Sequence, residues 1–390
     1  MRTRKVLIWV SSVAAVMVVG AFALLPGYLD ARLNPVVSAP VVSPSDIAQR
    51  LHRNLFVADL HSDFLLWSRD PLTRANRGHT DLPRLVEGNV ALQVFSTVTK
   101  SPRGQNYEAN RGDTDNITPL AVLQLWPPST WRSLAARALY QARRLVEASA
   151  RSGGRLSVIR TASDLDRFVQ QRSTNPGMIA GLLSTEGLQA LDGNLQNVER
   201  LFEAGFRMFG LTHFFDNEIA GSAHGIGKGG LTQLGRQVLR RMEELQILVD
   251  LAHASPRTIQ EVLGMTHRPV VISHTGVQGT CPGTRNLSDE QLRGIAATGG
   301  VIGIGYWDGA VCTIGAASTA RAIRHAVDVV GVNHVALGSD FDGTTRMPFD
   351  TSGLVQVTQA LLDQGFNPEQ IALIMGGNVL RLLRETLPQR

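Results

Sequence analysis

Histidine and acidic side chains stand at the ends of short apolar runs along this 390-residue sequence. The first run ends in His61 and Asp63, and later runs end in Glu186, His213, His253, His274 and Asp340. Residues two apart on a regular strand share a face, so His61 and Asp63 supply half of a metal site. Adding Glu186, His253 and His274 gives three imidazoles and two carboxylates, a ligand set that suits zinc. If one carboxylate bridges, this set holds two divalent ions, which would share a hydroxide able to attack a carbonyl or phosphoryl group.

Each of these residues also has an ordinary structural explanation. Glu186 precedes Gly187 and is of a type that begins helices, and Asp340 lies in a turn-like Ser-Asp-Phe-Asp-Gly stretch. Asp342-Gly343 is the more natural turn pair, which leaves Asp340 available for chemistry. The remaining histidines are interpreted as ordinary core or surface residues: His52, His79, His224, His267, His325 and His334. Five ligand-type residues at successive run ends favour a metal site over coincidence.

The elements that must position these side chains are short apolar runs alternating with amphipathic segments. The runs are Phe56–His61, Val90–Thr97, Gly177–Thr185, Met208–His213, Ile247–His253, Val270–His274, Val301–Tyr306 and Val335–Asp340. The expected helices include Gln196–Ala204, Gln233–Leu245, Pro256–Leu263, Asp289–Ala297, Thr319–Val330 and a C-terminal one from Pro368 to Leu387. Eight strands alternating with helices predict a closed (β/α)8 TIM-like barrel, in which the strand carboxyl ends converge on one face.

Other folds and chemistries find less support in the sequence. A doubly wound open sheet is the alternative fold, but no G-x-G-x-x-G fingerprint opens a helix after the first strand. No G-x-S-x-G nucleophile motif is present. Cys281 and Cys312 could pair or stay free thiols, and the sequence does not decide between them. The stretch 106–133 fits neither strand nor helix patterns and is interpreted as a lid or surface insertion.

Charge and hydropathy bear on partners and location. The net charge is +5, but three of the 38 basic residues lie in the first five positions, leaving 35 against 33 acidic residues. No nucleic-acid partner is therefore expected. Residues 6–25 form an almost continuous apolar run behind a basic flank, which predicts an uncleaved membrane anchor with the catalytic domain outside the cytoplasm; a cleaved signal is the alternative. We expect the flank and anchor in residues 1–25, a linker over 26–46 and the barrel over 47–390.

The sequence is similar to the renal (membrane) dipeptidase family of zinc metallopeptidases. The resemblance covers essentially Ile47 to Leu383, in family order. Its segments are Asp59–Asp63, Ser184–Gly187, Leu211–His213, Val249–His253, Pro269–His274, Arg285–Asp289, Gly338–Gly343 and Gly376–Asn378. The resemblance implies a metal-dependent hydrolase barrel with two zinc ions that hydrolyses dipeptides. A homodimer is a further expectation.

The resemblance also implies a role for each matched residue. His61 and Asp63 would hold one zinc ion, His253 and His274 the other, and Glu186 would bridge them. Three further residues would act on substrate: His213 stabilises the tetrahedral intermediate, Arg285 binds the substrate carboxylate and Asp340 is the acid/base group. Tyr306 matches a tyrosine near that carboxylate.

Two other functions remain open from the sequence. One is another metal-dependent barrel hydrolase, an amidohydrolase or lactonase acting on lactones, phosphoesters or amidated small molecules. The other is a catalytically silent, membrane-anchored binding protein that keeps the fold. The intact ligand positions and Asp340 argue against the silent protein.

Overall fold

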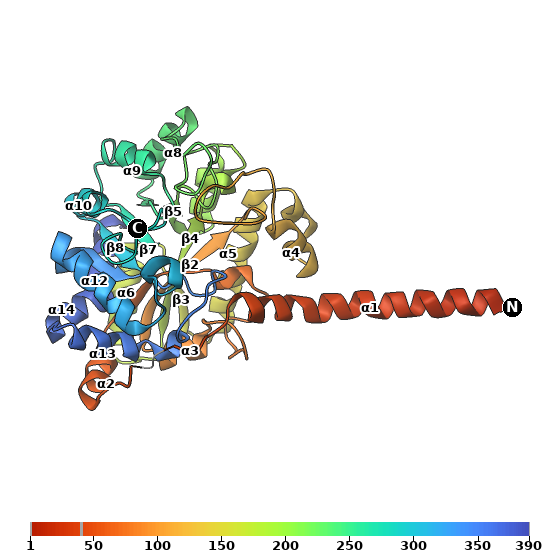
Figure 1. Ribbon diagram of the computed structural model, residues 1–390, viewed down its shortest axis with the longest axis horizontal. Helices are drawn as coiled ribbons and strands as arrows, with labels where there is room; N and C mark the ends of the chain where they lie inside the picture. The colour runs from red at the N-terminus through yellow and green to blue at the C-terminus, as the bar shows by residue number, and fades with distance from the viewer. Residues whose placement is uncertain (1, 40–41, 390) are drawn as a thin grey trace.

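The computed structural model describes residues 2–39 and 42–389, with only the backbone described for residues 2–16 and 18. The long N-terminal helix α1 (Arg2–Leu33) extends away from a rounded body that holds all other elements (Figure 1). The predicted membrane span, residues 6–25, falls mostly on residues whose side chains lie outside the described part. Among the residues that could be searched, no helix combines the length and the apolar character needed to cross a bilayer.

Parallel strands close into a barrel at the centre of the body. They are β1 (Val57–Ser62), β2 (Val90–Val98), β4 (Ile179–Glu186), β5 (Phe206–Gly210), β6 (Leu248–Asp250), β7 (Val271–Thr275), β8 (Val301–Ile304) and β9 (Val335–Leu337). The order runs β2-β1-β9-β8-β7-β6-β5-β4, and pairing of β2 with β4 closes it. The predicted TIM-like barrel is therefore confirmed. The sequence analysis did not predict β3 (Leu156–Val158), a three-residue strand that pairs beside the start of β4.

Helices surround the strands and connect them (Figure 1). The helices after α1 in the first half of the chain are α2 (Asp46–Arg53), α3 (Leu82–Glu87), α4 (Ile117–Leu123), α5 (Leu134–Arg151), α6 (Ala162–Arg172) and α7 (Asn197–Glu203). The second half adds α8 (Gln233–Glu244), α9 (Pro256–Leu263), α10 (Asp289–Ala297), α11 (Asp308–Val311), α12 (Ala316–Val330), α13 (Val355–Asp363), α14 (Pro368–Ala372) and α15 (Asn378–Thr386).

Local side-chain chemistry explains where several helices begin. Ser255 accepts a hydrogen bond from the Thr258 backbone N–H, and Ser288 accepts one from that of Gln291. These side chains satisfy N–H groups that have no partner within the helix, so α9 and α10 begin where the sequence predicts. The predicted C-terminal helix is broken between α14 and α15. A Cβ on Gly376 would lie 1.9 Å from the Phe56 carbonyl oxygen, so the glycine lets this segment approach the start of β1.

Buried apolar residues fill the space within the barrel and between its strands and helices. One cluster joins Leu183 of β4 and Val249 of β6 with Leu145 of α5. Another joins Leu60 of β1 with Leu382 of α15. Because strands and helices share these clusters, the barrel is a rigid frame for side chains at its carboxyl-terminal rim.

Candidate active site

Three predicted ligands lie within or at the end of barrel strands. His61 belongs to β1, Glu186 is the last residue of β4 and His274 belongs to β7. The pairing of β1 with β2 shifts register between Asp59 and Ser62, and the pairing of β7 with β8 shifts between Ile272 and Thr275. Such irregularities re-aim side chains near active sites. Asp63 lies one residue beyond the end of β1, so the two residues do not share a regular strand, but the Asp63 carboxylate does lie 3.3 Å from His61 Nε2.

Three other predicted residues lie beyond the strand ends. His213, His253 and Asp340 each follow the last strand residue by three positions, after β5, β6 and β9. The predicted strands were thus too long at these three ends. His253 and Asp340 both have φ 61°, a backbone conformation that costs energy for residues other than glycine. The loops, rather than the strands, aim these two side chains.

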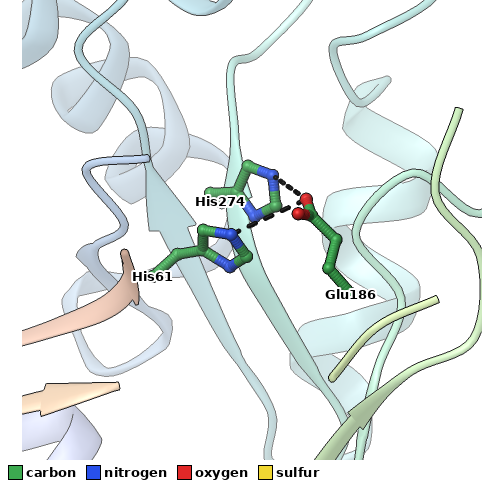
Figure 2. A group of neighbouring side chains, drawn as sticks. All are labelled: His61, Glu186 and His274. Atoms are coloured by element: carbon green, nitrogen blue, oxygen red, sulfur yellow. Dashed lines mark ion pairs between the residues drawn. The ribbon is translucent and has the colours of Figure 1, made fainter. Parts of the chain in front are cut away.

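The Glu186 carboxylate lies at the centre of a cluster of imidazoles. Its Oε1 atom is 3.1 Å from Nε2 of His253 and 3.5 Å from Nε2 of His274. The same oxygen is 3.6 Å from Nε2 of His61 and 3.4 Å from Nε2 of His213. Figure 2 shows the side chains of His61 and His274 directed at the Glu186 carboxylate. One carboxylate oxygen therefore has four histidines from four strand ends around it.

Two further carboxylates stand at the edge of this cluster. Asp63 Oδ1 is 3.3 Å from His61 Nε2. A carboxylate oxygen of Asp340 lies within 4.8 Å of the ligand atoms of both residues. The potential ligand atoms lie within 4.8 Å of one another in three buried groups: His61, Glu186 and His274; Glu186, His213 and His253; and His61, Asp63 and Asp340. The structure therefore brings all five predicted metal ligands together.

The unsatisfied polar atoms of the cluster fit bound cations. Nε2 of His61, Oδ1 of Asp63 and Oε2 of Glu186 are buried without a hydrogen-bond partner in the described part of the chain. Nε2 of His253 is also 3.0 Å from Nε2 of His274, a pair of nitrogens that need a shared proton or a cation. Imidazole nitrogens and carboxylate oxygens are zinc ligands, so the donor set agrees with the geometry.

Burial and mutual charge shift the ionisation of the cluster. Burial raises the pKa of Glu186 well above its usual value, and the Asp63 charge raises it further. Burial also raises the pKa of Asp340 to about 8, with the Asp63 carboxylate adding to the shift. Burial would lower the pKa of His61, but the charges of Glu186 and Asp63 outweigh it and raise that pKa to about 10. The cluster without cations thus retains protons that a dication would displace.

Two other predicted metal ligands, His253 and His274, are held in the neutral form. Burial lowers the pKa of His253 and of His274 well below the usual imidazole value, with the nearby Arg285 charge adding to each shift. A neutral imidazole is the form that binds metal. Ser273 Oγ lies 2.8 Å from Nδ1 of His274 and 3.3 Å from Nδ1 of His61, so one hydroxyl orients two rings.

A pocket opens beside this cluster. It is a cavity of about 100 Å³, lined by Asp63, Leu66, Val98, Ser101, Gln105, Tyr107, Ile117, Glu186, His213, Phe214, His253, Arg285, Trp307, Asp340, Gly343, Thr344 and Thr345. Arg285 is buried, donates to the His274 carbonyl oxygen at 2.8 Å and stacks over the Trp307 ring at 5.1 Å. The guanidinium is therefore fixed in the wall of the pocket.

Tyr306 lies elsewhere than the sequence predicts. It is fully buried, packs against Phe341 and Phe349, and is not among the described residues that line the pocket. Tyr107 lines the pocket instead, and its hydroxyl accepts a hydrogen bond from the Trp307 ring N–H at 2.9 Å. Tyr306, which follows β8, thus packs into the interior, and Tyr107 from a distant loop forms this part of the pocket wall.

Several pocket residues carried no signal in the sequence. Tyr107 and Ile117 come from the stretch 106–133, which contains α4 and covers one side of the pocket. Trp307 follows the predicted strand without a motif of its own. Cys281 and Cys312 form a disulfide that ties the loop carrying Arg285 to the segment after Trp307. These contacts depend on how loops meet in space, which periodicity does not encode.

A parallel barrel with carboxylates and imidazoles gathered at its strand carboxyl ends defines a metal-dependent hydrolase of the barrel type. The chain belongs to the membrane dipeptidase family, peptidase family M19, whose family model matches residues 45–389. It is therefore an enzyme, a metallo-dipeptidase, and the recognition from sequence is confirmed.

Named relatives agree with this membership. The chain is 29% identical over 356 residues to dipeptidase aclJ of Aspergillus oryzae, a match covering 84% of this chain and 77% of that protein. It is 29% identical over 344 residues to dipeptidase tcpJ of Claviceps purpurea, covering 83% and 73%. A metallopeptidase from Rhodobacter sphaeroides, solved with a phosphinate mimic of L-Ala-D-Ala, superposes with a TM-score of 0.70 at 25% identity, covering 85% of this chain and 99% of that one.

Proposed function

We propose that this enzyme is a binuclear zinc dipeptidase. The observation that carries the proposal is the position of Glu186 Oε1, within 3.6 Å of imidazole nitrogens on both sides of the cluster. A carboxylate in that place can bridge two cations. His61 and Asp63 would hold one zinc ion, and His253 and His274 would hold the other. Zinc bound there supplies Lewis-acid activation of water and of the peptide carbonyl.

Asp340 is the proton carrier in this proposal. Its carboxyl is buried at the pocket wall and belongs to the same group as His61 and Asp63. A carboxyl at this position can accept a proton from water and donate it to a leaving group within hydrogen-bond reach. Asp340 would accept the proton of the attacking water and deliver it to the leaving amine.

Arg285 and His213 would hold the two charged parts of the reacting substrate. The buried guanidinium of Arg285 can bind the substrate's C-terminal carboxylate through two parallel hydrogen bonds. His213 Nδ1 lies 3.3 Å from the Lys100 carbonyl oxygen, which places the ring proton on Nδ1. Burial lowers the pKa of His213 to about 4, so the ring is neutral near pH 7. As the resemblance implies, the neutral ring would lie beside the negative charge that develops in the tetrahedral intermediate.

The pocket geometry supports a preference for short substrates. Arg285, Tyr107 and Trp307 form part of the pocket wall. A substrate carboxylate bound to Arg285 would therefore face this wall and not open solvent. A peptide with further residues beyond that carboxylate would meet this wall. The Rhodobacter sphaeroides relative was solved with a mimic of L-Ala-D-Ala, so a substrate panel should include D-residues at the second position.

Zinc analysis combined with a substrate panel tests the proposal. The zinc-loaded enzyme should contain about two zinc ions per chain and hydrolyse dipeptides, with little activity on tripeptides, lactones or phosphoesters. Asp340→Ala should keep its zinc while kcat falls by about 10²–10⁴-fold. Preferred turnover of lactones or phosphoesters would point to another barrel hydrolase, and absence of both zinc and turnover to a silent binding protein. Loss of both zinc ions in Asp340→Ala would make its role structural.

We also propose that residues 1–25 anchor the enzyme to a membrane and that the catalytic domain lies outside the cytoplasm. The apolar run with its basic flank supports the anchor, and the Cys281–Cys312 disulfide fits an oxidising compartment. Deleting residues 1–25 should release the enzyme from the membrane fraction; retention would place attachment elsewhere. The expected homodimer is tested by light scattering of the purified enzyme, where a mass near 42.2 kDa would contradict it.

A further inference from the structure

The chain just before the family domain packs against a loop that lines the active-site pocket. The family model begins at residue 45, whereas Asp30, in the last turn of α1, and Asn34, just beyond it, are each only 2% exposed. Two polar side chains buried this deeply need hydrogen-bond or ionic partners, and here these partners lie within the residues that the family model matches. Both residues have their partners around the loop that carries Asp340.

A chain of alternating charges runs from Asp30 to this loop. Asp30 Oδ2 is 3.1 Å from Nε of Arg77 and 2.9 Å from Nε of Arg69. Arg69 is buried, and its Nη2 is 2.7 Å from Oδ1 of Asp342. Asp342 lies two residues after Asp340. The position of Arg69 between two carboxylates thus links α1 to the loop after β9.

Asn34 makes the more direct contact. Its side-chain N–H donates to Asp30 Oδ1 at 3.0 Å, and its Oδ1 accepts the Thr344 backbone N–H at 2.9 Å. Immediately after Asn34, the chain pairs with the far end of the same loop: the Met347 N–H donates to the Pro35 carbonyl, and the Val37 N–H donates to the Met347 carbonyl. The segment 34–37 therefore clamps the loop on its outer side.

The loop needs such a clamp because its backbone is strained. Asp340, Asp342 and Thr344 have φ values of 61°, 66° and 59°. Side chains other than glycine rarely adopt this conformation, and it persists only where surrounding contacts hold it. Asp340, Gly343, Thr344 and Thr345 line the pocket, and Thr345 Oγ1 donates to the Asp340 carbonyl at 2.9 Å. Relaxation at Thr344 would therefore move the carboxyl that carries the proton.

We infer that Asp30 and Asn34 are positioning residues for catalysis: they hold the loop 340–345 so that the Asp340 carboxyl faces the pocket. This inference rests on the proposed role of Asp340. It implies that a part of the chain outside the family domain sets the turnover rate, since a displaced reacting group loses rate more than it loses substrate binding.

The test uses full-length enzyme with three substitutions. Asn34→Ala removes the acceptor for Thr344, and Asp30→Asn removes one charge beside Arg69. Arg32→Ala is the matched control, since Arg32 is exposed and its guanidinium donates to the Tyr28 hydroxyl. With zinc content equal to wild type and temperatures well below melting, we expect kcat of both test variants to fall roughly tenfold, with KM within about twofold. Arg32→Ala should match the wild type. Unchanged kcat in folded Asn34→Ala would overturn the inference.

Hydrogen exchange gives a readout independent of turnover. In the wild type the Thr344 amide should be protected, and in Asn34→Ala it should exchange at least about tenfold faster, while amides of β4 stay unchanged. If Asn34→Ala does not fold, the wild type alone decides: a freely exchanging Thr344 amide contradicts the clamp. A wild type without dipeptidase activity would refute the proposed function, yet the exchange measurement would still judge the clamp.

Discussion

Oε1 of Glu186 lies 3.1 Å from Nε2 of His253, although 67 positions separate the two residues in the sequence. The contact exists because β4 and β6 end at the same rim of the barrel. A carboxylate that bridges two cations cannot be removed without disturbing both. Removing the Glu186 carboxylate therefore distinguishes a bridging ligand from an ordinary buried acid.

Glu186→Ala should abolish zinc binding at both positions. We expect the zinc content to fall from about two ions per chain toward none and dipeptide hydrolysis to become undetectable, because each cation loses one of its few ligands. Zinc analysis after dialysis against a weak chelator measures the effect. Glu203→Ala, which removes an exposed carboxylate from α7, is the matched control. A zinc content unchanged in Glu186→Ala would contradict the bridge.

Arg285→Lys should weaken the binding of substrates that carry a free C-terminal carboxylate. Lysine keeps the charge but cannot make two parallel hydrogen bonds, and such charge-assisted bonds contribute about 1.5–3 kcal/mol. KM for a dipeptide should therefore rise roughly tenfold to a hundredfold. The corresponding dipeptide amide lacks the carboxylate, so wild type and variant should treat it alike. An equal loss on the acid and the amide would assign Arg285 to structure rather than to recognition.

The sequence predicted the barrel and the cluster of candidate metal ligands for one physical reason. Each barrel strand is buried on both faces, so it appears as an apolar run, and the ligands follow these runs directly. His61, Glu186 and His274 are examples in which a local pattern and the three-dimensional site coincide. The exact strand ends were less predictable, since His253 and Asp340 lie on strained loops rather than on strands.

The parts that the sequence did not predict depend on contacts between distant loops. Tyr107 reaches the pocket from a stretch without periodicity, and its ring is placed by contacts with Trp307 and His224. His224, interpreted from the sequence as an ordinary core residue, lies 5.3 Å from the His253 ring, with its Nδ1 facing the Tyr107 carbonyl at 2.8 Å. Tyr306 is the opposite case. The family resemblance placed it in the pocket, but its ring is buried against Phe341 and Phe349.

Removal of the Cys281–Cys312 disulfide should destabilise the fold and weaken substrate binding. The bridge closes a loop with a sequence separation of 31 residues, and chain entropy predicts a loss of about 3–4 kcal/mol in the free energy of unfolding. Because the loop carries Arg285, KM should rise more than kcat falls in the double variant Cys281→Ser with Cys312→Ser. Urea unfolding of wild type and variant measures the stability. Reducing agent should destabilise the wild type only, and an equal response of both would exclude the disulfide as the cause.

A buried histidine far from the metal ligands should make stability depend on pH. His52 in α2 donates from Nε2 to the Gly88 carbonyl at 3.0 Å, and its Nδ1 lies 2.8 Å from the Thr358 hydroxyl. Burial lowers its pKa below the usual 6.5, an effect that the Gly88 hydrogen bond only partly offsets.

The sign of the effect follows from proton binding. As the pH falls below 6.5, the unfolded chain takes up a proton at His52 that the folded chain refuses, so the free energy of unfolding decreases. The contribution is complete above the unfolded pKa and is lost as the pH falls toward the folded pKa. His52→Gln should be less stable than wild type at pH 8, and the difference should shrink toward pH 5. Urea unfolding across this range, with the exposed His267→Gln as control, measures it. A difference independent of pH would show that the folded enzyme accepts a charged ring at this position.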